Sequence, residues 1–228
     1  MKKLLLIILI IFVTTPIVFG ATTNVYPVAD NFIDAESPTV NNGTSVAIQA
    51  YESWGTERRT ILRFTLPTLT GTISKVTLKL TADNNAQAGI NESVFLMAST
   101  TGAGWNETQS TWQIYQTGKN WSAYGGDYVN SVVGSSTSVA SSSVASFVLM
   151  GTGSLHPLTF TWGTTTNLLL KNDASYHAGG WTGSEWVSSN GGAQYWPYLL
   201  VEYTPPVAGP ASHQINSSAD FKSNVVIK

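Results

Sequence analysis

Hydrophobic and polar residues alternate with a period of two along much of the chain. The segment KVTLKLT at residues 75–81 places its valine and leucines on one face and its lysines and threonine on the other. The same alternation recurs at residues 60–66 and 198–203. Because successive side chains of a strand point to opposite sides of a sheet, this pattern predicts strands that are buried on one face.

Short apolar runs separated by turn residues fill most of the remaining sequence. The runs are SVFLMAS, ASFVLM, LTFTW and NLLLK, and glycine and asparagine cluster between them. After the first 20 residues, no segment has a helical period over three turns. Many short strands joined by such turns are typical of two-sheet folds, so the sequence predicts an all-β, jelly-roll-like β-sandwich that forms one domain over residues 21–204.

Two segments lack this regular alternation. Residues 131–146 (SVVGSSTSVASSSVAS) have low sequence complexity, which predicts a flexible surface loop or an outer edge strand. Residues 205–228 form a predicted linker and tail, because they begin with PPVAGP. Since the tail ends on the strand-like run ADFKSNVVIK, we expect the native chain to continue into a further domain or to pair with another chain.

Residues 1–20 predict a secretory signal peptide. Lys2 and Lys3 precede an apolar block of roughly 10 residues, and the small residues after it place cleavage after Gly20. A retained membrane anchor is the alternative, but the block is shorter than the ~20 residues of a spanning helix, and Pro16 interrupts its extension. We therefore expect a secreted, extracellular protein with no membrane association after cleavage.

Charge and cysteine content narrow the class of protein. Charged residues make up only 11% of the chain, the net charge is −2, and no basic patch is present, so nucleic acid is not an expected partner. The chain has no cysteine, so no disulfide joins its strands. Its stability is therefore expected to come from core area, with a bound ion as a possible addition.

Motifs of known catalytic machinery are missing from the sequence. It contains no H-E-x-x-H, G-x-S-x-G, phosphate-binding loop or dinucleotide fingerprint, and its 3 histidines are scattered. A glycosidase needs two carboxylates that face one sugar, and none of the 13 acidic residues stands in a recognisable setting of that kind. The sequence predicts a protein that is not an enzyme, with a polysaccharide lyase or hydrolase as the remaining catalytic alternative.

Aromatic residues gather in two segments rich in glycine and serine. A ring face can stack on the apolar side of a sugar while amides and hydroxyls bond its OH groups. The candidate sugar-binding residues are Trp121 and Tyr124 in residues 119–128, which also hold Asp127 and Tyr128, and Tyr176, Trp181 and Trp186 in residues 175–196, which also hold Gln194, Tyr195 and Trp196. Trp181 and Trp186 are the leading stacking platforms. The alternative is that these rings fold back as lids on the ends of the sandwich.

The segment GWNETQSTW at residues 104–112 allows two interpretations. Trp105, Glu107 and Trp112 could form a stacking site with a general acid, or two packed rings with a carboxylate that holds the loop. Tryptophans seven positions apart share a face only if the segment turns, and its Asn, Ser and Thr residues favour a turn. We predict that both rings plug one edge of the sandwich and that Glu107 accepts hydrogen bonds within the loop.

Asp30 and Glu185 are the candidate metal ligands. Asp30 begins the first strand-like segment and Glu185 precedes the last, and in a jelly-roll-like sandwich such ends can approach each other. Carboxylate oxygens are the ligands that Ca²⁺ prefers, so a structural calcium ion would join segments that no disulfide joins. The alternative is that each carboxylate accepts hydrogen bonds from N–H groups of loops.

The order of segments over residues 25–204 is similar to that of a known family. The segments are VADNFIDAESPTVNNGTSVAI, TERRTILRFTLPTL, ISKVTLKLTA, GWNETQSTW, NLLLKN, GSEW and YWPYLLVEYTPP. This order resembles the DNRLRE domain family, also classed as carbohydrate-binding module family 96. The resemblance implies a secreted β-sandwich module that binds carbohydrate and is attached to a larger enzyme or surface protein.

Individual positions of that family fall on residues of this chain. They are the early aspartate at Asp30, the P-x-x-N-x-G turn at Pro38, Asn41 and Gly43, the Arg-Phe pair at Arg63 and Phe64, the tryptophan pair with its acid at Trp105, Glu107 and Trp112, and the late Ser-Glu pair at Ser184 and Glu185. Thr65 stands where the family usually has aspartate. We therefore expect a non-catalytic module whose partner is a polysaccharide, and the alternative is a structural spacer or adhesion domain without a sugar ligand.

Overall fold

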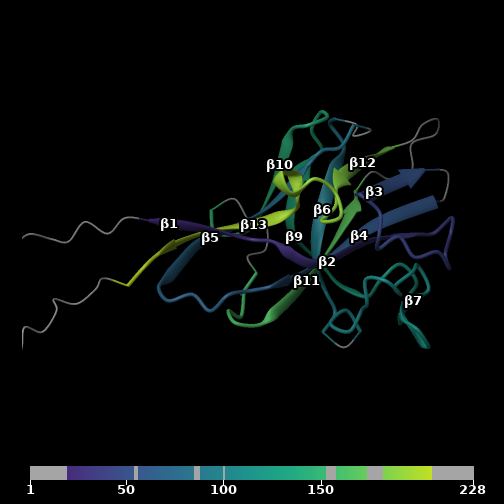
Figure 1. Cartoon of the computed structure of the whole chain (residues 1–228), viewed down its shortest axis with the longest axis horizontal. Coiled ribbons are helices and arrows are strands. Elements are labelled where there is room, and N and C mark those ends of the chain that lie inside the picture. The colour runs from purple at the N-terminus through teal and green to yellow at the C-terminus, as the bar shows by residue number, and fades with distance from the viewer. Residues whose placement is uncertain are drawn as a thin grey trace, which may run out of the picture.

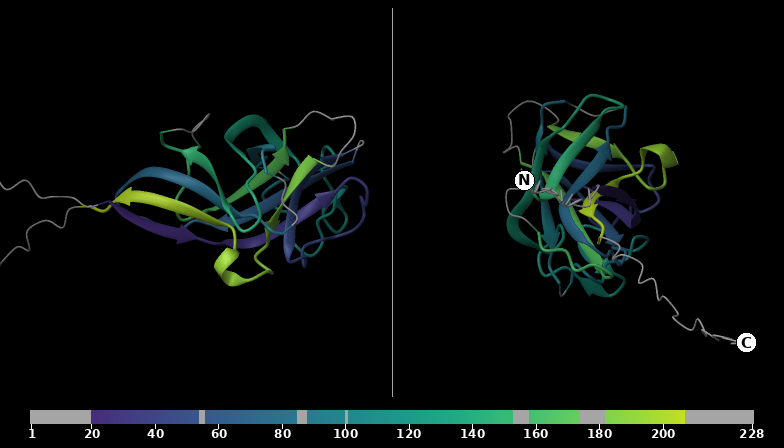
Figure 2. Two further views of the ribbon diagram at one scale, coloured as in Figure 1. Left: turned by 90° about the horizontal axis from the view of Figure 1, so that it is seen from above. Right: turned by 90° about the vertical axis from the view of Figure 1, so that its left-hand side faces the viewer.

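Two antiparallel sheets pack face to face (Figures 1 and 2). The computed structural model describes residues 20–53, 56–84, 88–99, 101–152, 158–173 and 182–206. The smaller sheet has the order β1 (Ala21–Val25), β13 (Tyr198–Thr204), β5 (Thr72–Thr81) and β10 (Val144–Met150). The larger sheet has the order β12 (Thr182–Val187), β3 (Ala47–Ser53), β4 (Thr56–Thr65), β11 (Thr165–Asn172), β6 (Asn91–Met97) and β9 (Tyr128–Thr137), and β2 (Pro27–Asp34) also pairs with β4. A short hairpin of β7 (Ile114–Gln116) and β8 (Lys119–Asn120) stands apart, and a single 3₁₀ turn (Ala193–Tyr195) precedes β13.

The strands bury the faces that the alternation assigns to the core. Val76 and Leu78 of β5 and Leu62 and Phe64 of β4 are 0% exposed, and they belong to one hydrophobic core between the two sheets. Arg63 lies between the last two in sequence, so its side chain emerges on the outer face of the larger sheet. The predicted all-β sandwich is confirmed.

A second hydrophobic core lies on the outer face of the larger sheet. Residues 98–127, which we call the covering loop, connect β6 to β9 and include the β7–β8 hairpin. Their buried rings, Trp105 and Trp121, pack on apolar residues of the strands below, which are Ala29, Ile33, Ile61, Phe95, Met97 and Leu169. Part of the larger sheet is therefore buried on both faces, which the alternation alone does not predict.

Residues 131–146 form the end of β9, a turn and the start of β10. β9 is the outer strand of the larger sheet next to β6, whereas β10 is the outer strand of the smaller sheet. The edge-strand interpretation is therefore confirmed for most of this low-complexity segment, and residues 138–143 form the turn between the two strands. Its serines suit a strand whose side chains are partly exposed to solvent.

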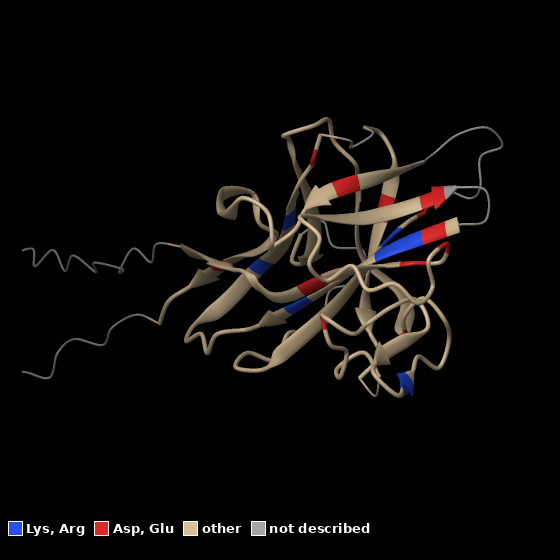
Figure 3. Cartoon of the chain, turned by 45° about the vertical axis from the view of Figure 1, so that its right-hand side comes forward, with Lys and Arg blue, Asp and Glu red and all other residues tan. Residues whose placement is uncertain are grey.

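The two described chain ends lie together. β1 and β13 pair side by side and extend past the rest of the molecule, while the covering loop with β7 lies at the other end (Figure 1). Most of the ribbon carries no charged residue (Figure 3). The described part of the chain contains no helix long and apolar enough to cross a membrane. The predicted signal peptide, except Gly20, and all but the first two residues of the predicted tail lie outside the described residues.

Candidate functional site

The covering loop is fixed to the sheet by Trp105 and Arg63. Trp105 is 1% exposed, and its Nε1 donates a hydrogen bond to Asn167 Oδ1 at 3.0 Å. The Arg63 guanidinium lies over the indole, 4.6 Å from the ring centroid, and donates hydrogen bonds to the same Asn167 oxygen and to the Trp105 carbonyl. Both polar groups of this stack are bonded, so the arrangement stabilises the loop, and the burial of Trp105 keeps its ring from contact with a sugar.

Glu107 holds the covering loop to β2. Its Oε1 accepts a hydrogen bond from the Asp30 N–H at 3.0 Å, and its carbonyl accepts one from Asn41 Nδ2 at 2.7 Å. Partial burial raises the pKa of Glu107, although the Asp30 hydrogen bond and the charge of Arg63 oppose this rise. Gly43 packs so closely that a Cβ there would lie 2.0 Å from the Glu107 carbonyl oxygen. The glycine of the P-x-x-N-x-G turn is thus required by this close approach.

The packing interpretation of residues 104–112 is confirmed, with two corrections. The rings cover the outer face of the larger sheet instead of plugging an edge of the sandwich, because apolar strand residues on that face need a cover. The hydrogen bond to the Glu107 carboxylate comes from β2 and not from within the loop. Trp112 is only partly buried, and Arg59 lies over its ring at 4.9 Å.

Two of the predicted stacking platforms are core residues. Trp186 is 0% exposed, because β12 pairs with β3 and turns this ring into the core, where it meets Phe147 edge-on at 6.4 Å. Trp121 is 3% exposed, and its Nε1 donates to the Thr111 carbonyl at 2.9 Å. Neither ring offers a face to a ligand, so their assignment as platforms is wrong. Tyr176 and Trp181 lie outside the described residues.

Asp30 and Glu185 each accept hydrogen bonds from the protein. The Asp30 carboxylate accepts the Ser188 hydroxyl at 2.8 Å and the Ser189 N–H at 2.6 Å, and Glu185 Oε1 accepts Gln49 Nε2 at 3.0 Å. Asp30 thus joins β2 to the segment after β12 through hydrogen bonds, as the hydrogen-bonding alternative expects. Across the described ranges, no group of three or more His, Asp or Glu side chains is placed to hold a metal ion. The structural calcium stays a prediction.

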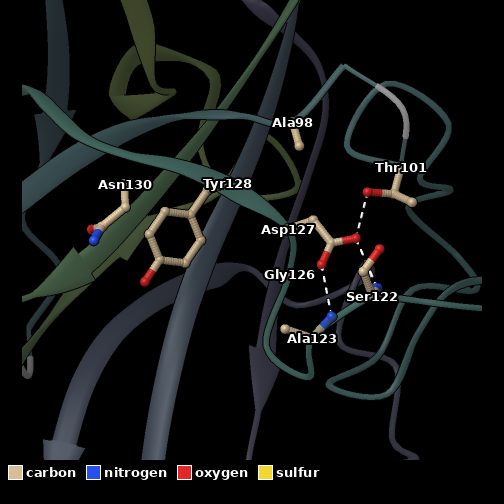
Figure 4. A pocket seen from close by; sticks show the side chains of 8 residues that line it. All are labelled: Ala98, Thr101, Ser122, Ala123, Gly126, Asp127, Tyr128 and Asn130. Carbon is tan, nitrogen blue, oxygen red and sulfur yellow. Dashed lines mark hydrogen bonds between the residues drawn. The ribbon is translucent and has the colours of Figure 1, made fainter.

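A hollow of about 460 Å³ opens where the covering loop runs into β9 (Figure 4). We call it the Tyr128 hollow, and its lining residues are Ala98, Thr101, Ser122, Ala123, Gly126, Asp127, Tyr128 and Asn130. Binding sites for small molecules usually have volumes of several hundred Å³ and combine apolar surface with a few polar groups. The Tyr128 hollow meets both criteria.

Asp127 shapes one wall of the Tyr128 hollow. Its carboxylate accepts the Ser122 N–H at 2.8 Å, the Ala123 N–H at 2.9 Å and the Thr101 hydroxyl (Figure 4). Burial is the largest single effect on the pKa of Asp127 and raises it, but these hydrogen bonds together outweigh burial and lower the pKa. The carboxylate is therefore ionised at neutral pH, and it holds the loop in place.

Two glycines bring the loop onto the sheet before β9. Gly125 and Gly126 have φ angles of 88° and 90°, which residues with a Cβ rarely adopt. A Cβ on Gly125 would also lie 2.7 Å from the Trp112 ring, and the Gly125 carbonyl accepts a hydrogen bond from Arg59 at 2.8 Å. Tyr124, which precedes this tight turn and follows the lining residue Ala123, is 60% exposed.

Tyr128 and Asn130 form the opposite side of the Tyr128 hollow (Figure 4). The Tyr128 ring packs on Phe95 at 4.9 Å, and the Lys171 ammonium lies 5.9 Å from its centroid. The Asn130 side chain is exposed and belongs to the outer face of β9. An aromatic ring, an amide and a hydroxyl around one concave surface are the groups that sugars require.

The sequence located only part of this hollow. The aromatic segment at residues 119–128 contains Asp127 and Tyr128, which line the hollow, and the exposed Tyr124, which follows the lining residue Ala123 in the chain. Asn130 and Thr101 were missed, because isolated polar residues carry no local pattern that marks a site. Thr101 comes from the far end of the covering loop, so only the fold reveals its position.

Another group of aromatic residues lies beside β13. Tyr26 is 46% exposed and contacts Trp196 and Tyr198, with ring centroids 6.2 and 6.0 Å away. The nearby Tyr195 lines a smaller hollow of about 210 Å³. We place this group second to the Tyr128 hollow, because the hollow beside it has less than half the volume of the Tyr128 hollow.

Comparison with known protein families and with curated proteins gives one result. The model of a family described as carbohydrate-binding module family 96 matches residues 21–164. The matched residues run from β1 to the segment before β11 and include the covering loop and every residue that lines the Tyr128 hollow. No curated protein matches the chain.

Proposed function

The chain belongs to carbohydrate-binding module family 96, and we propose that it is a secreted, non-catalytic module that binds polysaccharide through the Tyr128 hollow. The observation that carries this proposal is the juxtaposition of the Tyr128 ring with the exposed Asn130 amide around a concave surface of about 460 Å³. Tyr124, which is 60% exposed and follows the lining residue Ala123 in the chain, supplies a second ring in this proposal.

The chemistry of the hollow supports sugar binding. A pyranose has apolar C–H faces that favour contact with an aromatic ring, and OH groups that need donors and acceptors. Tyr128 offers a ring within the hollow and the exposed Tyr124 a second ring next to Ala123 in the chain, whereas Asn130, Thr101 and Ser122 offer polar groups. The rigid backing of Tyr128 by Phe95 favours affinity, because a fixed ring loses little freedom on binding.

A binding role is favoured over catalysis by the carboxylate in the hollow. Glycosidases place two carboxylates on either side of the bond that they cleave. Of the described residues that line the Tyr128 hollow, Asp127 alone carries a carboxylate, and both of its oxygens accept hydrogen bonds from the loop. A carboxylate bonded in this way is suited to hold the wall of a site, and it is poorly placed to donate or abstract a proton.

The position of the hollow suits a module carried by a larger protein. The start of β1 and the end of β13 lie side by side, because the two strands are antiparallel. The covering loop lies at the far end of the sandwich (Figure 1). Domains joined at the β1–β13 end would leave the Tyr128 hollow facing away from them. Secretion rests on the predicted signal peptide, and the polymer is expected to be extracellular.

Affinity electrophoresis tests the proposal. The parent protein should be retarded by at least one polymer in a panel of xylan, glucomannan, mixed-linkage β-glucan, alginate and polygalacturonate. Asn130→Ala and Tyr124→Ala should each weaken that retardation about fivefold or more, since a central anchor contributes on the order of 1 kcal/mol or more. Both side chains are exposed, so the melting temperature should stay that of the parent.

Tyr195→Ala is the matched control, because this tyrosine is 45% exposed at another place on the surface. It should be retarded like the parent. The alternative function, a spacer or adhesion domain without a sugar ligand, predicts that no polymer retards the parent protein. Release of new reducing or unsaturated ends from a polymer would instead establish a hydrolase or lyase.

A further inference from the structure

A second hollow lies at the other end of β9. It has a volume of about 390 Å³ and is lined by Asn91, Ser135, Ser136, Thr137 and Asp173. We call it the Thr137 hollow. Its lining consists of hydroxyl, amide and carboxylate side chains, so it is suited to a ligand that carries many OH groups.

The two hollows open on the same face of the larger sheet. Phe95 and Val132 lie opposite each other on β6 and β9, and both pack in the outer core. Continuing along the ladder, Asn91 is paired with Thr137. Asn91 is four positions from Phe95, and side chains of a strand alternate, so Asn91 and its partner face outward as Phe95 does. The same argument applies to β11. Leu169 belongs to the outer core, and Lys171 and Asp173 follow it at alternate positions, so they belong to the outer face as well.

Lys171 occupies the surface between the two hollows. Its ammonium lies 5.6 Å from the Phe95 centroid and 5.9 Å from the Tyr128 centroid. Tyr128 lines the first hollow, and Asp173, two residues after Lys171, lines the second. Phe95 itself is buried, so the strip from one hollow to the other carries a donor group, the Lys171 ammonium, at its middle.

The strip is long compared with a single sugar. Along β6 it extends from Ala98 in the first hollow to Asn91 in the second, which is seven residues or about 24 Å at the rise of an antiparallel strand. One pyranose ring covers only a fraction of this length. A chain of several sugar units lying along β9 is needed to reach both hollows.

We propose that the Tyr128 hollow and the Thr137 hollow are two subsites of one extended site, which holds an internal stretch of a polysaccharide chain along β9. This inference rests on the proposed function of the Tyr128 hollow and adds where the polymer runs. The Thr137 subsite recognises OH groups through Asn91, Ser135 and Thr137, which are exposed. The Asp173 N–H donates to the Asn91 carbonyl at 2.9 Å and so fixes the wall of this subsite.

The test uses size-graded oligosaccharides from whichever panel polymer retards the parent protein. Calorimetric titration should show affinity that rises at least tenfold from the disaccharide to oligomers long enough to span both hollows and then reaches a plateau. The double variant Asn91→Ala, Thr137→Val should bind the shortest oligomers like the parent and lose most of this gain. Asn130→Ala should weaken binding at every length.

Thr22→Val is the matched control, because Thr22 is an exposed strand threonine on β1, away from both hollows. It should bind every oligomer like the parent. If the parent binds the polymer but its affinity is the same at every length, or if the double variant keeps the whole gain, the extended site is refuted while the function of the Tyr128 hollow stands. If the parent binds none of the polymers, both proposals fail together.

Discussion

Trp105 and Arg63 form a stacked pair in which both polar groups bond the same oxygen, Asn167 Oδ1, at 3.0 Å. The pair joins the covering loop to two neighbouring strands, because Arg63 belongs to β4 and Asn167 to β11. A motif that could have been a sugar-stacking site is therefore the anchor of a structural loop. The anchor matters for function, because this loop forms one wall of the Tyr128 hollow.

Trp105→Ala should lower the free energy of unfolding by about 3–5 kcal/mol, the usual range for truncation of a large buried ring. Trp105→Phe keeps most of the apolar area but removes the hydrogen bond to Asn167, so it should cost less, on the order of 1–3 kcal/mol. Urea denaturation followed by tryptophan fluorescence measures both. A Trp105→Ala variant that unfolds at the parent's urea midpoint would refute the anchoring role.

Gly125→Ala should destabilise the covering loop and weaken sugar binding. The substitution introduces a Cβ at a φ of 88° and places it 2.7 Å from the Trp112 ring. Gly118→Ala is the matched control, because Gly118 has a φ of 74° but no atom within 4 Å of the added Cβ. Backbone strain alone costs on the order of 1 kcal/mol, so Gly118→Ala should lose about this much and Gly125→Ala clearly more. Equal losses in thermal melts would show that the contact with Trp112 does not matter.

Glu92 should make the stability of the protein depend on pH. This side chain is 0% exposed in the core, and burial raises its pKa to about 8. The charge of Asp173 raises it further, whereas the neighbouring Ser184 and Trp186 side chains lower it without reaching good hydrogen-bond geometry. The folded state therefore keeps a proton that the unfolded state loses above the ordinary pKa of 4.5.

The contribution of Glu92 to the free energy of unfolding should therefore be fully present below pH 4.5. It should be lost as the pH rises towards about 8. The slope is at most about 1.4 kcal/mol per pH unit. Glu92→Gln should remove this contribution, because an amide of the same shape does not ionise, and the surface variant Glu202→Gln should keep it. Urea titrations at pH 5, 6.5 and 8 compare them, and an unchanged pH profile for Glu92→Gln would rule out the protonated core carboxyl.

Alternation predicted the inner core well, because residues such as Leu78 and Leu62 face only the opposing sheet. It did not predict the outer core, since that face needs a cover that comes from a loop remote in sequence. A signal was nevertheless present in Leu168–Leu170, which are apolar without alternation and are all buried. An uninterrupted apolar run is typical of a strand buried on both faces.

The candidate site was harder to predict than the fold. Trp186 stands in a glycine- and serine-rich segment that reads as a loop, yet six residues of that segment form β12 and turn the ring inward. The exposure of Tyr124 could be expected, because two glycines follow it and make a turn. Asn91 and Thr137 could not be linked by sequence, because their pairing depends on the register of β6 and β9.

Amide chemical-shift mapping tests the central claim most directly. The ¹⁵N-labelled protein is titrated with oligosaccharides from the polymer that retards it, and the shifted amides are assigned along the chain. We predict that the largest shifts fall at residues 98–101 and 122–130, with those at 91 and 135–137 joining them only for longer oligomers. Shifts confined to Tyr26, Trp196 and Tyr198, with the amides around Tyr128 unmoved, would contradict the account and place the sugar on the β13 side of the molecule.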